Sequence, residues 1–277
     1  MRHITILEYR HYRYLKIATA LQALAILAYA IHSPSVGPYG GTWLGYTLGT
    51  VGALLILWLL WFGVRKRRYL DASGTLQGWL SGHVYLGASL LVIVTLHTGF
   101  EFGWNLHTLA YVLMVLVIVS GFYGVYAYLR YPRLLTDNIG EETLPDLLQK
   151  ISDMDGQART LAMRQPDEIN VLVLRASQET RIGGSVMQQL SGKQKNCPTA
   201  FAVEKVQVLG KKFNGDQGRV NRELCAVLLR KKSLVEQARK DVWIKARIDI
   251  WLYVHVPLSI SLLVALTAHV VSVFFYW

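Results

Sequence analysis

Long apolar runs dominate the pattern of hydrophobic and polar positions along this chain. They cover residues 15–31, 44–64, 79–100, 108–129 and 251–275. Each is close to the length of about 20 residues that an α-helix needs to cross the hydrocarbon core of a bilayer. The pattern therefore predicts an all-α membrane protein, built as a bundle of five transmembrane helices.

A stretch of soluble composition, residues 130–250, separates the fourth apolar run from the fifth. Apolar residues recur at helical spacing from Leu144 onward, and a long helical pattern that begins at Gly218 continues into the last run. Two short apolar runs between these patterns, INVLVL at residues 169–174 and FAVEKVQVL at residues 201–209, predict β-strands. We therefore expect a small insertion of mixed helix and strand between the fourth and fifth spans.

Positive charge is distributed unevenly along the chain. The formal net charge is +11, and most of the 29 Lys and Arg residues lie in residues 130–250, whereas the loops at residues 32–43 and 101–107 contain neither. Because Lys and Arg accumulate in cytoplasmic loops, this distribution places the N-terminus in the cytoplasm and the C-terminus outside, as in a bacterial cytoplasmic membrane. Topology thus accounts for the charge, and we expect no nucleic-acid partner. The expected organisation is a cytoplasmic N-terminal segment at residues 1–14, transmembrane helices 1–4 at residues 15–129, the cytoplasmic insertion at residues 130–250, and transmembrane helix 5 at residues 251–277.

Two pairs of histidines share one spacing. His83 and His97 lie 14 residues apart in the third apolar run, and His255 and His269 lie 14 residues apart in the fifth. Fourteen residues of α-helix advance about 21 Å and stop about 40° short of four full turns. Each pair therefore lies on one face of its helix, with one member toward each side of the membrane. Ionisable side chains inside a bilayer are costly and usually functional.

Matched imidazoles on two helices that run in the same direction are suited to a flat group bound from both faces. Haem iron takes two axial ligands on opposite sides of its macrocycle. We therefore predict two haem b groups, an inner one between His83 and His255 and an outer one between His97 and His269. A zinc or copper site would need three or four ligands at one depth, and we expect no third histidine or carboxylate at either level.

The doubled histidine pattern resembles the diheme cytochrome b superfamily, which includes the cytochrome b subunit of quinol–cytochrome c reductases and the membrane part of ferric reductases. In that superfamily, two histidines on each of two helices ligate two b haems stacked across the membrane. The resemblance covers the second to fifth spans. It implies that small residues on the flanking helices let the haem edges approach, and close helix packing explains the same residues equally well. These residues are Gly49, Gly63, Gly121 and Gly124.

Two features of the superfamily are not found in this sequence. The Pro-Glu-Trp-Tyr tetrapeptide of the quinol-oxidising site is missing, and so is the flavin and NADPH module of ferric reductases. We therefore expect an electron-transfer subunit of an oxidoreductase complex. It would carry electrons across the lipid bilayer between the quinone pool and partner redox subunits of the cytochrome c, iron–sulfur or flavoprotein type. Whether the chain is an enzyme by itself stays open at this point, as do two alternatives: a self-contained transmembrane metalloreductase, and a non-redox channel or transporter with structural histidines.

Further candidate residues lie near the two ends of the spans. Arg65, Arg67 and Arg68 follow the second span, where they could bind the propionates of the inner haem or simply set the topology. Glu101 and His107 lie in or beside an outer loop and are the candidates for an outer quinol site, with Glu101 as a proton acceptor. A solvent-exposed acid and an interfacial histidine are the alternatives there.

Overall fold

The computed structural model describes residues 6–34, 37, 39–67, 75–139, 142–192 and 196–275, without the side chains of residues 66, 67, 137 and 139. Helices make up 84% of the structure and no strand occurs among the described residues, so the fold class is all-α. Five helices are long and apolar enough to cross a membrane. The chain is thus an integral membrane protein built as a helical bundle, as its apolar runs predict.

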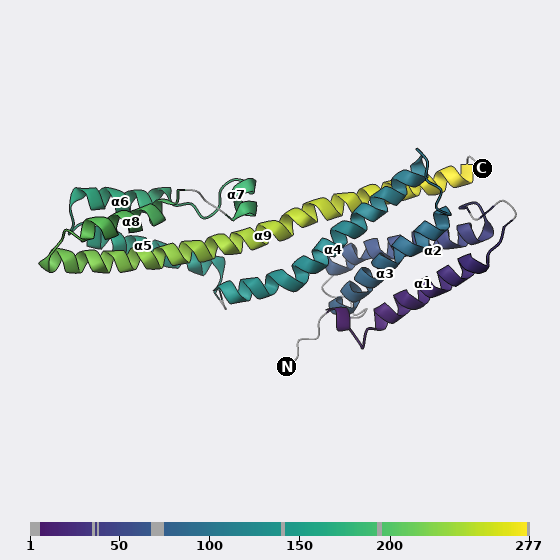
Figure 1. Ribbon diagram of the computed structural model, residues 1–277, viewed down its shortest axis with the longest axis horizontal. Helices are drawn as coiled ribbons and strands as arrows, with labels where there is room; N and C mark the ends of the chain where they lie inside the picture. Colours follow the sequence, from purple (N-terminus) through teal and green to yellow (C-terminus); the bar gives the residue numbers. More distant parts are fainter. Residues whose placement is uncertain are drawn as a thin grey trace. The chain divides into compact units, whose positions relative to one another are not determined.

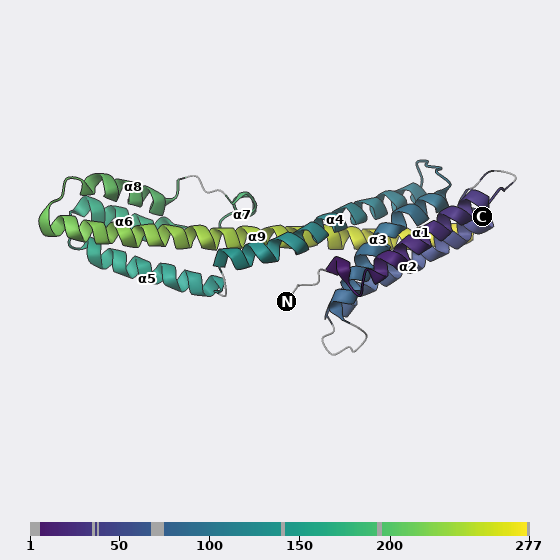
Figure 2. The same cartoon turned by 60° about the horizontal axis from the view of Figure 1, so that its bottom comes forward.

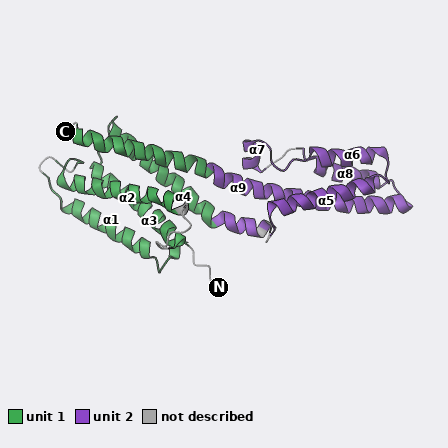
Figure 3. Cartoon of the chain, turned by 180° about the vertical axis from the view of Figure 1, so that it is seen from behind, with its two compact units in different colours: residues 1–129, 251–277 green, residues 130–250 purple. Residues whose placement is uncertain are grey.

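The chain forms two compact units (Figure 3), which we call the membrane unit and the insertion unit. The membrane unit comprises residues 1–129 and 251–277, and the insertion unit comprises residues 130–250. In chain order, the elements are η1 (Ile6–Glu8), α1 (Arg13–Ile31), α2 (Trp43–Arg67), α3 (Leu76–Thr98), α4 (Leu106–Ile139), α5 (Leu144–Ala162), α6 (Asp167–Glu179), α7 (Val186–Ser191), α8 (Pro198–Gly210) and α9 (Gly215–Phe275), and they are labelled in Figure 1.

The core of the membrane unit draws side chains from all five long helices. Its buried residues are Ala18 of α1, Ile56 of α2, Leu90 of α3, Met114 of α4 and Leu262 of α9. Figure 2 shows α1, α2 and α3 side by side in this unit, and these helices also have the closest backbone contacts. Large apolar side chains cover the outside of the same helices. Such a surface suits lipid, whereas in water it would be a liability to aggregation.

Helix α3, which carries the first histidine pair, has a defined start and end. Thr75 caps its N-terminus, because its side chain accepts a hydrogen bond of 3.2 Å from the backbone N–H of Gly78. Gly99 ends the helix in the left-handed conformation, with a φ of 61°. Near its start, the hydroxyl of Tyr85 donates to the backbone carbonyl of Leu7, at 3.1 Å. These contacts hold η1 and the first turns of α3 together.

Helix α9 is 61 residues long and carries the second histidine pair. It begins in the insertion unit, passes through Pro257 without ending, and supplies the last membrane span. The prediction of a helical pattern that runs from Gly218 into the last apolar run is therefore confirmed. The prediction of a helix from Leu144 is confirmed as well, since α5 begins at that residue.

The prediction of strands in the insertion unit was wrong. Residues 169–174 lie in α6 and residues 201–209 lie in α8, so the insertion is all-helical and not mixed. The burial pattern explains the difference. In α6 the buried residues are Ile169, Val173 and Ala176, which recur with the period of a helix and not with the alternation of a half-buried strand.

The valines of these two helices are accommodated by packing against α9. The buried side chains of α8, which include Ala202 and Val206, join those of α6 in one core cluster with Leu224 and Leu228 of α9. Valine has a lower helix propensity than leucine or alanine, but the difference is small, and tertiary packing outweighs it. The strand prediction followed the β-branched composition and missed the one-sided burial.

Candidate functional site

The outer pair of histidines meets across α3 and α9. The ring centroids of His97 and His269 lie 6.1 Å apart, with an angle of 81° between the ring planes. A metal–nitrogen bond of about 2 Å puts the centroid of a ligating imidazole about 3 Å from the metal, so two rings on opposite sides of one ion lie about 6 Å apart. The observed separation of these two rings fits that spacing.

The tautomer of His97 follows from its hydrogen bond. Its Nδ1 atom lies 2.7 Å from the backbone carbonyl oxygen of Gly45. A carbonyl only accepts hydrogen bonds, so Nδ1 must carry the proton and donate it. The lone pair of the neutral ring is then on Nε2, which is the arrangement that a ligating histidine needs.

Helix α2 approaches His97 closely because it has glycine at two turns. A Cβ atom at Gly49 would lie 2.7 Å from Cε1 and 2.9 Å from Nδ1 of His97, too close for any side chain. At Gly45 a Cβ atom would lie 2.5 Å from the backbone oxygen of Tyr39. The first of these glycines therefore lies directly against a predicted ligand, and the second supplies the carbonyl that accepts its proton.

His107, in the first turn of α4, adds a third imidazole at the outer level. Its Nδ1 atom makes a short hydrogen bond with Nδ1 of His269, and the two ring centroids lie 4.4 Å apart with perpendicular planes. The expectation of no third histidine at this depth was therefore wrong. His107 follows a loop, and spacing within the spans says nothing about its depth. Even so, the described residues hold no group of three or more His, Cys, Asp or Glu side chains arranged to bind a metal ion.

The inner pair, His83 and His255, also comes from α3 and α9, and its two rings are close enough to interact electrostatically. The ring of His83 packs against Phe62 of α2, with 5.1 Å between centroids. Its Nδ1 atom is buried and makes no well-formed hydrogen bond within the described part of the chain, although the backbone of Leu59 interacts with the ring. A buried polar atom of this kind would usually have a partner.

His255 is held by α4. Its Nδ1 atom lies 2.7 Å from the hydroxyl oxygen of Ser120, and that hydroxyl donates its own proton to the carbonyl of Val117, at 2.8 Å. Ser120 therefore accepts from Nδ1–H of His255, which leaves the lone pair on Nε2. The indole N–H of Trp251 donates to the backbone carbonyl of the same serine, at 2.8 Å.

The donor set fits haem. At His97 and His255 the protein accepts the Nδ1 proton, and at His269 the same atom is engaged by His107. A protein partner on the second nitrogen is the usual companion of a metal-ligating imidazole, since it fixes the tautomer and the orientation of the ring. Histidines that served only as packing would not need their Nε2 atoms left over at two levels.

The remaining candidate residues lie in different surroundings. A Cβ atom at Gly121 would lie 3.8 Å from Cε1 of His255, at Gly124 it would overlap Trp251, and at Gly63 it would meet nothing within 4 Å. Arg65 is buried at the end of α2, and Glu101 is exposed between α3 and α4. Arg68 and the side chain of Arg67 lie outside the described residues.

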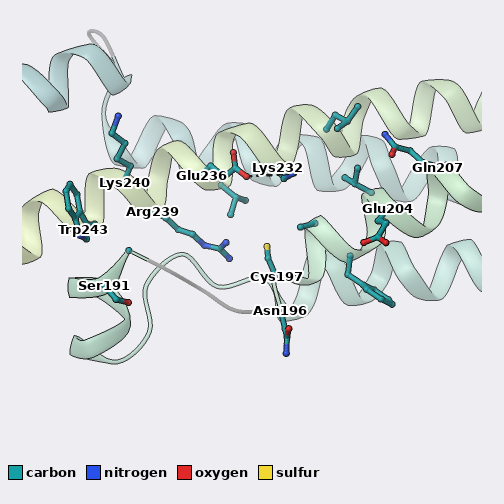
Figure 4. A pocket seen from close by; sticks show the side chains of 16 residues that line it. Ser191, Asn196, Cys197, Glu204, Gln207, Lys232, Glu236, Arg239, Lys240 and Trp243 are labelled. Carbon is teal, nitrogen blue, oxygen red and sulfur yellow. Dashed lines mark ion pairs between the residues drawn. The ribbon is translucent and has the colours of Figure 1, made fainter.

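A separate groove lies in the insertion unit, between α7, α8 and α9 (Figure 4), with a volume of about 1140 Å³. Phe201 and Trp243 contribute apolar surface, while Lys232 and Glu236 place opposite charges 3.9 Å apart on its α9 side. No histidine is among the described residues that line it. The groove therefore has no part in the two histidine levels.

Sequence reasoning missed three residues that hold the histidines: Gly45, Ser120 and Trp251. A backbone carbonyl leaves no mark in a sequence, and a serine in a membrane span is common. The adjacent pair Ser120-Gly121 on α4, one helix away from a histidine span, was the only available signal. Comparisons with protein-family models, curated proteins and solved structures find no match for this chain.

Proposed function

We propose that this chain is a diheme b-type membrane cytochrome, which carries electrons across the bilayer between a quinone or quinol and partner redox subunits. One observation carries the proposal: four histidines form two cross-helix pairs, and at both levels the protein engages Nδ1 and leaves Nε2. Haem iron, when bound, supplies one-electron redox chemistry. The protein's own part is to bind, orient and shield.

The spacing of the two levels supports transfer across the membrane. His83 and His97 are separated by about 21 Å of helix, which is a large part of the hydrocarbon thickness of about 30 Å. His255 and His269 repeat this separation on α9. The core around Leu90, Met114 and Leu262 fills the space between the helices with apolar side chains and keeps water away from the inner half of this path.

The orientation that we propose puts the insertion unit and the inner pair on the cytoplasmic side, with the outer pair beside Glu101 and His107. It rests on the distribution of Lys and Arg. A membrane-impermeant maleimide tests it in right-side-out membrane vesicles. A cysteine introduced by Glu101→Cys should be labelled, while Cys197 and Cys225 should react only after the vesicles are opened. The reverse pattern would contradict this orientation.

The test of the function itself is spectroscopic. Protein purified from haem-replete cells should be red, and its dithionite-reduced spectrum should show a b-type absorption band that is bleached on oxidation. Reduction of the purified protein by a short-chain quinol would support the quinone half of the proposal. A haem-free preparation would refute the cytochrome. Haem that quinol leaves oxidised while a soluble metal complex oxidises it would favour a metalloreductase instead.

A further inference from the structure

We infer that Ser120 is a positioning residue for His255: its hydroxyl, braced by Trp251, fixes the tautomer and the ring plane of this histidine. The inference rests on the proposed function, since it concerns the protein's own residues around a predicted haem ligand. It adds a residue to which the sequence pattern assigned no role.

The proton count at Ser120 decides the direction of the hydrogen bond. A serine hydroxyl has one proton to donate, and Ser120 gives it to the carbonyl of Val117, at 2.8 Å. The contact of 2.7 Å with Nδ1 of His255 must therefore be donated by the imidazole. In this state the ring cannot turn over without losing the bond.

Trp251 braces this arrangement from the other side. It lies one helical turn before His255 on α9, and its ring packs against the imidazole with 5.3 Å between centroids and 33° between planes. Its indole N–H donates to the backbone carbonyl of Ser120, at 2.8 Å. Gly124, one turn after Ser120 on α4, makes room for the indole, because a Cβ atom there would lie 2.1 Å from it.

The result is a lock made of two residues on each helix, namely Ser120 and Gly124 of α4 with Trp251 and His255 of α9. Its consequence for a bound metal is chemical as well as geometric. A hydrogen bond donated from Nδ1 raises the electron density at Nε2, so it strengthens the imidazole as a ligand and favours the oxidised metal. Loss of an outer partner of this kind typically weakens metal binding 10- to 100-fold, as an order of magnitude.

The experiment compares hydroxyl variants of the full-length protein in detergent. Ser120→Ala removes the acceptor, and Ser120→Thr keeps it. Ser259→Ala is the matched control, because the hydroxyl of Ser259 bonds only to the backbone carbonyl of His255, at 2.7 Å. Trp251→Phe keeps an aromatic ring and removes its donor, which gives a second route to the same answer. The readouts are transfer of haem to excess apomyoglobin, the midpoint potential of each haem, and the low-spin ferric electron paramagnetic resonance spectrum.

We expect Ser120→Ala to lose one of the two haems about 10- to 100-fold more readily than wild type. The midpoint potential of that haem should rise and its ferric signal should shift. Ser120→Thr and Ser259→Ala should behave like wild type, and Trp251→Phe should change the signal of the same haem. If wild type holds two haems and Ser120→Ala matches it in all three readouts, the positioning role is refuted while the cytochrome stands. If wild type holds no haem, the proposed function fails, and this inference fails with it.

Discussion

Gly49 of α2 lies so close to His97 of α3 that a Cβ atom on the glycine would be 2.7 Å from Cε1 of the imidazole. Cβ atoms essentially never approach that closely, so the glycine is required by the position of the histidine ring. Gly63, 14 residues further along the same helix, has nothing within 4 Å of its Cβ position. Two glycines that look equivalent in the sequence are thus distinguished by what they touch.

This contrast predicts different effects of one methyl group at the two sites. Gly49→Ala should push the ring of His97 away, at a cost typical of overpacking of about 1–3 kcal/mol. The outer haem should then dissociate roughly 5- to 150-fold more readily. Gly63→Ala, the matched control, should leave both haems in place. Haem content after gel filtration checks this, and equal loss in the two variants would show that the contact with His97 is not what matters.

His107 is predicted to support the outer level through His269. His107→Leu removes the only described hydrogen-bond partner of Nδ1 on that ring. We expect it to weaken retention of the outer haem by about 10- to 100-fold and to spare the inner one. His32, which packs edge-on against Trp43 with 5.2 Å between centroids, provides the control variant His32→Leu. Midpoint titrations that give the same two potentials for His107→Leu and wild type would argue against this role.

The insertion unit contains a buried ion pair that should dominate its local stability. The side chain of Lys231 is 1% exposed, and its Nζ atom lies 2.6 Å from Asp155 and 2.7 Å from the carbonyl of Ala176. Asp155→Asn would leave a buried ammonium without its counter-charge, which costs about 3–5 kcal/mol when a pair is fully buried and somewhat less here, since Asp155 is 18% exposed. Glu236→Gln breaks an exposed pair with Lys232 and should cost under about 1 kcal/mol.

Hydrogen exchange measured by mass spectrometry on the intact chain distinguishes these two variants. Peptides from α5 and from the start of α9 should exchange markedly faster in Asp155→Asn than in wild type, because the opening free energy of this unit falls. The same peptides in Glu236→Gln should match wild type. Similar exchange in both variants would mean that the buried pair adds nothing to the stability of the unit.

The N-terminus of α5 is predicted to respond to acid. Hydrogen bonds from the hydroxyl and the backbone N–H of Thr143 hold the pKa of Asp146 below its usual value. Because the folded-state pKa is the lower one, this cap stabilises the helix fully above the unfolded value of about 4, and its contribution is lost as the pH falls through the folded-state pKa. Carboxyl-carbon NMR should show Asp146 titrating at lower pH than a free aspartate.

A pair of threonine variants tests the cause of that shift. Thr143→Ala removes the hydroxyl donor and keeps the backbone one, so the pKa of Asp146 should rise part of the way to its usual value. Thr160→Ala, in the same helix, removes a hydroxyl that bonds only to the carbonyl of Gly156 and should leave the titration unchanged. An unaltered titration in Thr143→Ala would assign the shift to other charges.

The spans and the two histidine pairs could be predicted because each depends on one helix alone. A run of about 20 apolar residues has few other places to go than a membrane, and an offset of 14 residues puts His83 and His97 on one face whatever the neighbouring helices do. The helices of the insertion unit were harder to predict. Val171 and Val173 suggested a strand by composition, and only the packing of α6 against α9 decides otherwise.

The partners of the histidines could not be predicted because they come from other helices. The carbonyl of Gly45 and the hydroxyl of Ser120 reach His97 and His255 across interfaces whose rotation no spacing rule determines. His107 lies beyond a loop, so its depth depends on where α4 begins. Sequence patterns thus located the candidate ligands, and the structure was needed to find what orients them.

The most direct test of the account is the number of haems per chain in purified wild type and in single histidine variants. We predict about two non-covalent b haems in wild type. His97→Ala and His269→Ala should each lose the same one, His83→Ala and His255→Ala should each lose the other, and His97→Ala combined with His83→Ala should lose both. A chain that binds no haem, or four single variants that all keep two, would contradict the assignment of these histidines as two pairs of axial ligands.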